Sequence, residues 1–175
     1  SYLYDYKKLI TNFEINTTYP KKDSVDYMLT ICNKTELIKK AILLNYFNTD
    51  NFIWVDFGIK HVFKCSDDEF IEKLNNLYNK YNSIIRIAAI WNLEYNYNID
   101  IYKNVAWYFA GGVFGGNKNM LLEFSELMKI KCIEIITRQN TIMWEVNIWY
   151  LIYLENKELF DAYYCDHNDS IIDNY

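Results

Sequence analysis

Glycine is scarce in this chain and concentrated in two places, which limits where the backbone can depart from ordinary helix and strand geometry. Only five glycines occur among the 175 residues. Four of them lie in the heptapeptide 110–116, and the fifth, Gly58, ends the motif Trp-Val-Asp-Phe-Gly at residues 54–58. Glycine is needed where the backbone takes a positive φ or where another group approaches it closely. We therefore expect the binding or catalytic site at these two motifs.

The composition predicts one folded domain that does not bind nucleic acid. A chain of 175 residues, half of them hydrophobic, is long enough for one substantial core. The net charge is −5 and no run of lysine or arginine exceeds two residues, so the basic surface that nucleic acid requires is absent. The sequence shows no membrane span and no signal peptide. Its four scattered cysteines favour a reduced, cytoplasmic protein without a zinc site.

Apolar periodicity predicts strands that alternate with helices. Helices are expected over residues 34–47, about 66–80, 120–136 and 142–154. Strands are expected over residues 52–55, 83–90, 105–110 and 161–164, and a loop over residues 92–104. The alternation indicates a layered α/β domain. We assign this domain to residues 34–175 and expect residues 1–33 to form an irregular N-terminal segment.

The motif at residues 54–58 places a carboxylate at the end of a predicted buried strand, with a flexible turn after it. Ligands of open α/β sheets bind at the carboxyl ends of strands. Asp56 can therefore ligate a divalent metal or accept hydrogen bonds from a ribose; alternatively, it only caps its own turn. The letters Asp-Phe-Gly do not indicate a kinase, because the glycine-rich segment follows them and no His-Arg-Asp motif occurs.

The heptapeptide 110–116 is expected to be a loop between a strand and a helix. Successive glycines let backbone N–H groups converge on an anion, or let a sugar lie against the main chain. The segment matches neither a Walker loop nor the dinucleotide-binding pattern. A plain strand-to-helix turn is the alternative, but it needs a single glycine. We predict that the site uses Gly111, Gly112, Gly115 and Gly116.

Three further side chains are candidates for chemistry or binding. His167 could join Asp56 in holding Mn²⁺ or Mg²⁺, although a lone histidine is commonly structural, as His61 is expected to be. Glu145 lies in the first turns of a predicted helix beside tryptophans. Partial burial suits a carboxylate to act as a general base, whereas the helix dipole alone would also favour an acid there. Trp107 could stack on the face of a sugar.

Taken together, the helix at residues 34–41, the motif at 52–61, the segment at 107–116 and the pair at 144–145 resemble the HtrL/YibB-type family of bacterial proteins. The similarity runs over most of residues 25–175, and the combination of W-x-D-x-G with A-G-G-x-F-G-G carries it. Members are treated as nucleotide-sugar-dependent glycosyltransferases of the GT-A kind. The resemblance therefore implies a GT-A-like mixed sheet flanked by helices. Residues 1–33 lack the opening strand and loop of that fold, so part of the N-terminal nucleotide-binding half could be missing or supplied by other sequence.

The resemblance also implies roles for particular residues. Asp56 would stand where a GT-A enzyme keeps its metal and nucleotide carboxylate, and His167 would join it around Mn²⁺ or Mg²⁺. Glu145 would be the base that acts on the acceptor. Gly111, Gly112, Gly115 and Gly116 would form the loop beside donor and acceptor sugars. Apart from the resemblance, we also expect Trp54, Gly58 and Trp107 to contact the substrate. Because residues 56–58 are not a full Asp-x-Asp motif, the dependence on metal is left open.

We therefore expect a hexosyltransferase that moves a sugar from a nucleotide-sugar donor to a hydroxyl of a glycan, lipid or protein acceptor. A non-catalytic carbohydrate-binding or assembly module derived from a transferase is the alternative. A phosphotransferase is disfavoured, because Lys118 follows the glycines without a serine or threonine after it. The donor, the acceptor and the oligomeric state are left open.

Overall fold

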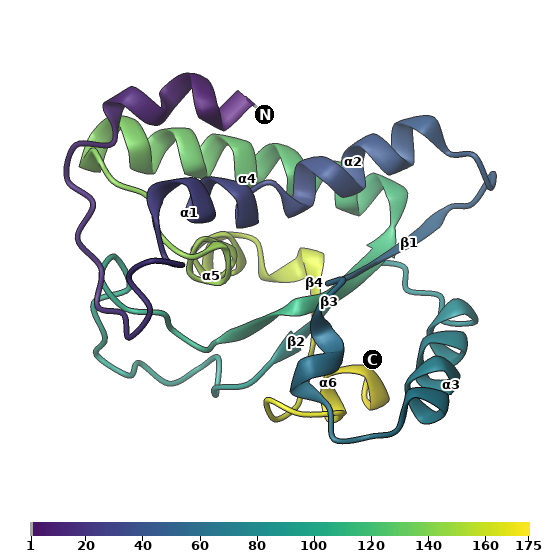
Figure 1. The fold of residues 1–175 in the computed structure, drawn as a ribbon. Helices are drawn as coiled ribbons and strands as arrows, with labels where there is room; N and C mark the ends of the chain where they lie inside the picture. The colour runs from purple at the N-terminus through teal and green to yellow at the C-terminus, as the bar shows by residue number, and fades with distance from the viewer. Residues whose placement is uncertain (1) are drawn as a thin grey trace.

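The computed structural model describes residues 2–175 as one four-stranded mixed sheet with helices on both faces (Figure 1). The strands are β1 (Asn51–Val55), β2 (Ile85–Ala89), β3 (Phe109–Asn117) and β4 (Phe160–Tyr164). Their order in the sheet is β1-β3-β2-β4, and β3 runs antiparallel to both of its neighbours while β2 and β4 are parallel. The carboxyl ends of β1, β2 and β4 therefore all lie at the same end of the sheet, where β3 begins.

The described helices agree closely with the apolar periodicity of the sequence. The α-helices are α1 (Val25–Ile31), α2 (Lys34–Leu44), α3 (Asp67–Tyr78), α4 (Lys118–Gln139), α5 (Glu145–Glu155) and α6 (Ser170–Asp173). Short 3₁₀ helices are η1 (Tyr2–Leu9), η2 (Ile59–Val62) and η3 (Lys157–Leu159). The predicted α/β class, four of the predicted helices and three of the predicted strands are thus confirmed. None of the described helices has the length and apolar character needed to cross a bilayer.

The two faces of the sheet carry cores of different size. On one face, η1, α1, α2, α4 and α5 enclose the larger core, which includes Trp149, Phe114 and Phe124 (Figure 1). On the other face, η2, α3 and α6 cover a smaller core that includes Val113 and Tyr163. Because helices lie on both faces, the central strands β2 and β3 are largely buried. The outer strand β1, expected to be buried, is half-buried throughout, and β4 is partly exposed, because each has a neighbouring strand on one side only.

The glycine-rich segment is a strand and not the expected loop. β3 begins at Phe109 and contains all four glycines, so the prediction of a strand ending at residue 110 is corrected. The glycines are required by close packing: a Cβ on Gly115 would lie 2.6 Å from the carbonyl oxygen of Phe52, and one on Gly112 would lie 2.7 Å from Ile59 Cδ1. Both separations are shorter than real Cβ contacts allow, so a larger residue would push these neighbours away.

The N-terminal region also differs from its expected irregular structure. Residues 2–9 form η1 and residues 25–31 form α1. Leu3, Met28 and Leu29 are fully buried in the larger core, against the same elements as the rest of the chain. The proposed domain boundary at residue 33 stays a prediction.

Candidate functional site

A pocket of about 590 Å³ opens at the end of the sheet that holds the carboxyl ends of β1, β2 and β4. Six parts of the chain line it: residues 16–27, the start of α2, the turn after β1 with η2, the start of β3 with the residues before it, the first turn of α5, and the segment after β4 with α6. The backbone N–H of Asp56 donates to the carbonyl of Gly112 at 2.8 Å, which fixes the turn after β1 against β3. The two motifs singled out in the sequence therefore meet in this pocket.

A buried lysine stands at the centre of the polar wall. The ammonium of Lys34 lies 2.8 Å from Asp56 Oδ2, 2.9 Å from Glu145 Oε1 and 2.9 Å from the carbonyl oxygen of Gly111. Its side chain is only 10% exposed. Lys34 is the first residue of α2, where the helix dipole disfavours a cation. The two carboxylates and the carbonyl offset that cost, so all three donors of the ammonium are used inside the protein.

Asp56 is held from both sides by donors. Its Oδ2 accepts the bond from Lys34, and its Oδ1 accepts a 2.6 Å hydrogen bond from the indole N–H of Trp54. Residues 54 and 56 lie on the same side of β1 because side chains alternate along a strand. The ring of Trp54 is anchored in turn by stacking on Phe114, with ring centroids 6.2 Å apart. This arrangement fixes the orientation of the carboxylate.

Glu145 is the second carboxylate of the cluster and is almost completely buried, with 7% of its side chain exposed. It begins α5, where the helix dipole favours a negative charge. Its Oε1 lies so close to β3 that a Cβ on Gly111 would approach it to 2.6 Å. The absence of a side chain at residue 111 therefore lets Glu145 reach Lys34.

The charges in this cluster decide the protonation state of Lys34. Burial by itself lowers the pKa of a lysine, but the adjacent Glu145 and Asp56 carboxylates outweigh it and raise the pKa of Lys34 above its ordinary value. The lysine is therefore an ammonium at neutral pH. One cation and two carboxylates leave a net negative cluster, which attracts hydrogen-bond donors such as hydroxyl groups and repels anions.

Aromatic rings line the part of the pocket nearer to solvent. The rings of Trp107 and His167 lie 5.2 Å apart between centroids at an angle of 60°, and 37% of Trp107 is exposed. His61 also lines the pocket, and its Nδ1 contacts the carbonyl of Gly58. These rings give the pocket flat apolar faces beside its carboxylates.

Residues 16–27 form a wall that the sequence did not indicate. Tyr19 is largely exposed in the pocket, and the ammonium of Lys22 lies 5.1 Å above the ring of Tyr27. No periodic pattern marks these residues, so only the three-dimensional packing brings them to the site. Lys34 was missed for a different reason: it looked like an ordinary polar residue at a helix start, and the partners that bury it lie 22 and 111 positions away.

The structure brings most of the predicted site residues together. The residues that line the pocket are Asp56, Gly58, Trp107, Gly111, Gly112, Glu145 and His167. Trp54 supports Asp56 from within β1 and does not line the pocket. Gly115 and Gly116 lie farther along β3, paired with Ile53 and Phe52, and also do not line the pocket. Their roles in substrate binding stay a prediction that the geometry does not support.

The residues around Asp56 do not fit a divalent metal. Lys34 and Trp54 already donate to both oxygens of the carboxylate, and the ammonium would repel a second cation at that position. Within residues 2–175, no three His, Cys, Asp or Glu side chains are grouped so as to hold a metal ion. The prediction of Mn²⁺ or Mg²⁺ at Asp56 and His167 is therefore left without support from the donor set.

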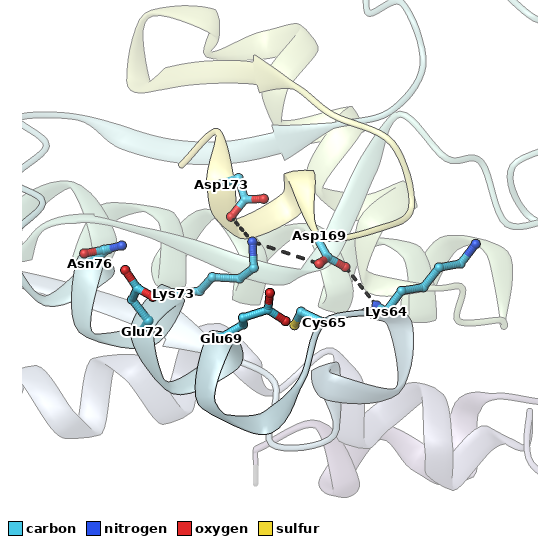
Figure 2. A pocket seen from close by; sticks show the side chains of 8 residues that line it. All are labelled: Lys64, Cys65, Glu69, Glu72, Lys73, Asn76, Asp169 and Asp173. Carbon is cyan, nitrogen blue, oxygen red and sulfur yellow. Dashed lines mark hydrogen bonds and ion pairs between the residues drawn. The ribbon is translucent and has the colours of Figure 1, made fainter.

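A second hollow, of about 500 Å³, lies on the outer side of the smaller core between α3 and α6 (Figure 2). Lys73 of α3 reaches across to the carboxylates of Asp173 and Asp169, and Asp169 Oδ1 accepts a 3.0 Å hydrogen bond from the backbone N–H of Lys64. Glu69 caps the start of α3. These contacts tie the segment that follows His167 to α3 and to the residues that precede it, which indicates a structural role.

Comparison with known proteins gives one match. The model of a family described as "Bacterial protein of unknown function (HtrL_YibB)" matches residues 6–171. No curated protein and no solved structure matches the chain.

Proposed function

Because the chain belongs to the HtrL_YibB family of bacterial proteins of unknown function, we propose a function from the chemistry of its pocket. The proposed activity is transfer of a sugar from a nucleotide-sugar donor to a hydroxyl of a glycan, lipid or protein acceptor. One observation carries this proposal: Asp56 and Glu145 converge on Lys34 beside the side-chain-free backbone of Gly111, in a pocket with exposed aromatic faces.

This combination suits a saccharide. Carboxylates accept strong, charge-assisted hydrogen bonds from sugar hydroxyls. Aromatic rings such as Trp107 and Tyr19 present faces on which the apolar side of a sugar or a nucleobase can stack. Gly111 and Gly112 also line the pocket, where the space beside them is taken by Glu145 and Ile59, so these glycines position the side chains that face the ligand. A cavity of about 590 Å³ also falls within the usual range for small-molecule sites.

Glu145 is the residue we assign as general base. Its Oε1 is held by Lys34, and the residue lines the pocket. In this proposal the carboxylate accepts the proton of the acceptor hydroxyl as the new glycosidic bond forms and the bond from the sugar to the nucleotide diphosphate breaks. Lys34 is a positioning residue here, because its ammonium fixes both carboxylates and has no donor left for substrate.

The charges of the pocket suggest how the donor lies. The negative cluster around Lys34 disfavours a diphosphate beside Asp56, so we place the sugar there and the diphosphate elsewhere in the pocket. Lys22 is a further lysine that lines the pocket, and we assign the diphosphate to it; His61 and His167 also line the pocket and can donate hydrogen bonds. In this orientation we place the nucleobase of the donor near Tyr19 and Tyr27, which also line the pocket.

A specific observation also favours the alternative of a non-catalytic carbohydrate-binding module. The carboxylate cluster is net negative and lacks a metal-binding donor set, and both properties suit a neutral saccharide better than a nucleotide diphosphate. The two functions differ in the ligand: the enzyme binds nucleotide sugars, whereas the module binds only free glycans.

Thermal shift with a panel of UDP- and GDP-sugars and of free oligosaccharides separates these functions. We expect a nucleotide sugar to raise the melting temperature without added metal, and the protein to release free nucleotide diphosphate slowly. Glu145→Gln should keep the shift and lose the release, because the amide cannot accept a proton. Stabilisation by free glycans alone would favour the binding module, and stabilisation by neither class would refute both.

A further inference from the structure

The last two residues of α2 and the segment that follows them expose four large apolar side chains within five residues. Leu43, Leu44, Tyr46 and Phe47 are 69%, 59%, 82% and 91% exposed. Single exposed apolar residues are normal, but a contiguous group on a folded protein marks an interaction surface. We call residues 43–47 the apolar tip.

The apolar tip is a fixed turn. Asn45 ends α2 in the left-handed conformation, with φ of 38°. Its side chain accepts a 2.9 Å hydrogen bond from the N–H of Thr49 and donates to the carbonyl of the same residue at 3.1 Å. The N–H of Asn48 donates to the carbonyl of Asn45 at 3.0 Å. Because the backbone is held by these bonds, the four apolar side chains are kept pointing outward.

The shape of this region argues against a protein partner. The connection between α2 and β1 projects beyond the end of α4 and the sheet (Figure 1). Stable protein interfaces use about 20–30 residues and about 800 Å² from each partner. Two copies meeting through a convex turn of five residues would contribute much less. A lipid bilayer needs no complementary surface, because apolar side chains enter the boundary between headgroups and acyl chains directly.

The residues around the apolar tip have the composition of a membrane–water interface. Lys40 is exposed one helical turn before Leu43 and Leu44. At the base of the tip, Lys118 pairs with Asp50. Exposed Tyr81 precedes Asn82, whose carbonyl accepts a 2.8 Å hydrogen bond from the side chain of Asn51 at the start of β1. Lysines therefore lie on α2 before the tip and at its base, and a tyrosine lies near the start of β1. Lysine and tyrosine side chains bury an apolar part and keep a polar end in water.

We propose that the apolar tip inserts into the surface of a lipid bilayer and attaches the protein peripherally. The apolar side chains supply the attraction, and the lysines add to it when the lipids are anionic. The tip lies at the beginning of β1 and the pocket at its end, so this surface is separate from the site of the proposed sugar transfer. The inference does not depend on that proposed function.

Co-sedimentation of the whole chain with phosphatidylcholine vesicles, with and without phosphatidylglycerol, tests the inference. We expect the protein to sediment with both kinds of vesicle, and more strongly with the anionic kind. The double substitution Tyr46→Ser with Phe47→Ser should weaken this partitioning at least tenfold. Phe57→Ser is the matched control, because Phe57 is a fully exposed phenylalanine at the other end of β1 and should be indifferent to lipid.

Three results would overturn the inference. The first is a double variant that sediments as well as the unsubstituted protein, and the second is an unsubstituted protein that sediments with neither vesicle. The third is a concentration-dependent dimer, abolished by the double substitution and found without vesicle binding, which would identify a second copy as the partner. Equal melting temperatures of the three proteins would show that folding is not the cause of any difference.

Discussion

Lys34 is the residue on which the site depends, because its ammonium joins two carboxylates that lie far apart in the sequence. Lys34→Met would leave Glu145 buried without a cation. Removing one partner of a buried ion pair typically costs about 3–5 kcal/mol of stability. We expect a loss of about this size in urea titrations, and Glu145→Gln in the same background should recover part of it.

The control for this variant is Lys7→Met. Lys7 pairs with Asp26 at 2.7 Å, but both side chains are about half exposed. Exposed pairs are worth roughly 0–1 kcal/mol, so this change should have little effect. If both variants lost the same small amount, the assignment of Lys34 as the central cation of a buried cluster would be wrong.

Gly111 and Gly58 offer a sharper comparison at the same scale. A Cβ on Gly111 would lie 2.6 Å from Glu145 Oε1 and 3.3 Å from Lys34 Nζ, whereas one on Gly58 would meet nothing within 4 Å. Gly111→Ala should therefore cost about 1–3 kcal/mol by overpacking and should also weaken ligand binding. Gly58→Ala, at an ordinary negative φ, should be neutral or stabilising by up to about 1 kcal/mol in the same denaturation experiment. Equal stability of the two variants would contradict the packing of Glu145 against β3.

Among the elements, α3 begins with a capping box that is testable by itself. The side chain of Ser66 accepts from the N–H of Glu69, and the Glu69 carboxylate accepts from the backbone N–H of Ser66. Ser66→Ala should cost about 1 kcal/mol, because one N–H at the helix start loses its partner. Ser83→Ala, at an exposed position in a loop, should stay within about 0.5 kcal/mol of the parent. A similar midpoint of denaturation for both would show that the cap contributes nothing.

The elements also show what the sequence could and could not predict. α2, α3 and β1 were predictable because their apolar spacing and their helix starts are local properties of the chain. The glycine-rich part of β3 was mistaken for a loop because four glycines lower the β propensity, and what makes it a strand is antiparallel pairing with β1 and β2, which lie elsewhere in the sequence. In the site, Asp56 and Glu145 were found as carboxylates at element ends, whereas the ion pairs that join them required the fold.

For the whole molecule, many buried groups titrate at high pH. Burial raises the pKa values of the Tyr2, Tyr163 and Tyr175 hydroxyls above their ordinary value near 10, and raises the pKa of the Cys165 thiol to about 11. Each of these groups loses its proton at a lower pH in the unfolded chain than in the folded protein. The free energy of unfolding is therefore not reduced by these groups below about pH 9, and it falls as the pH rises above that value.

We accordingly expect the melting temperature to fall steeply from about pH 9 upward, with Lys34 adding to the loss above its ordinary pKa because its folded-state pKa is also raised. Calorimetry combined with the ultraviolet absorbance of tyrosinate measures both events. The buried tyrosines should ionise together with unfolding. Their ionisation in a protein that stays folded would contradict the burial described here.

The central claim is that the pocket around Lys34 recognises the sugar of a nucleotide sugar, and calorimetric titration in the presence of a chelator tests it most directly. The parent protein should bind one nucleotide sugar at least tenfold more tightly than the corresponding nucleotide diphosphate, which is about 1.4 kcal/mol. Asp56→Asn should abolish that difference while leaving the affinity for the diphosphate unchanged. Equal affinities for the two ligands in the parent protein, or an undiminished preference in the Asp56→Asn variant, would contradict the account.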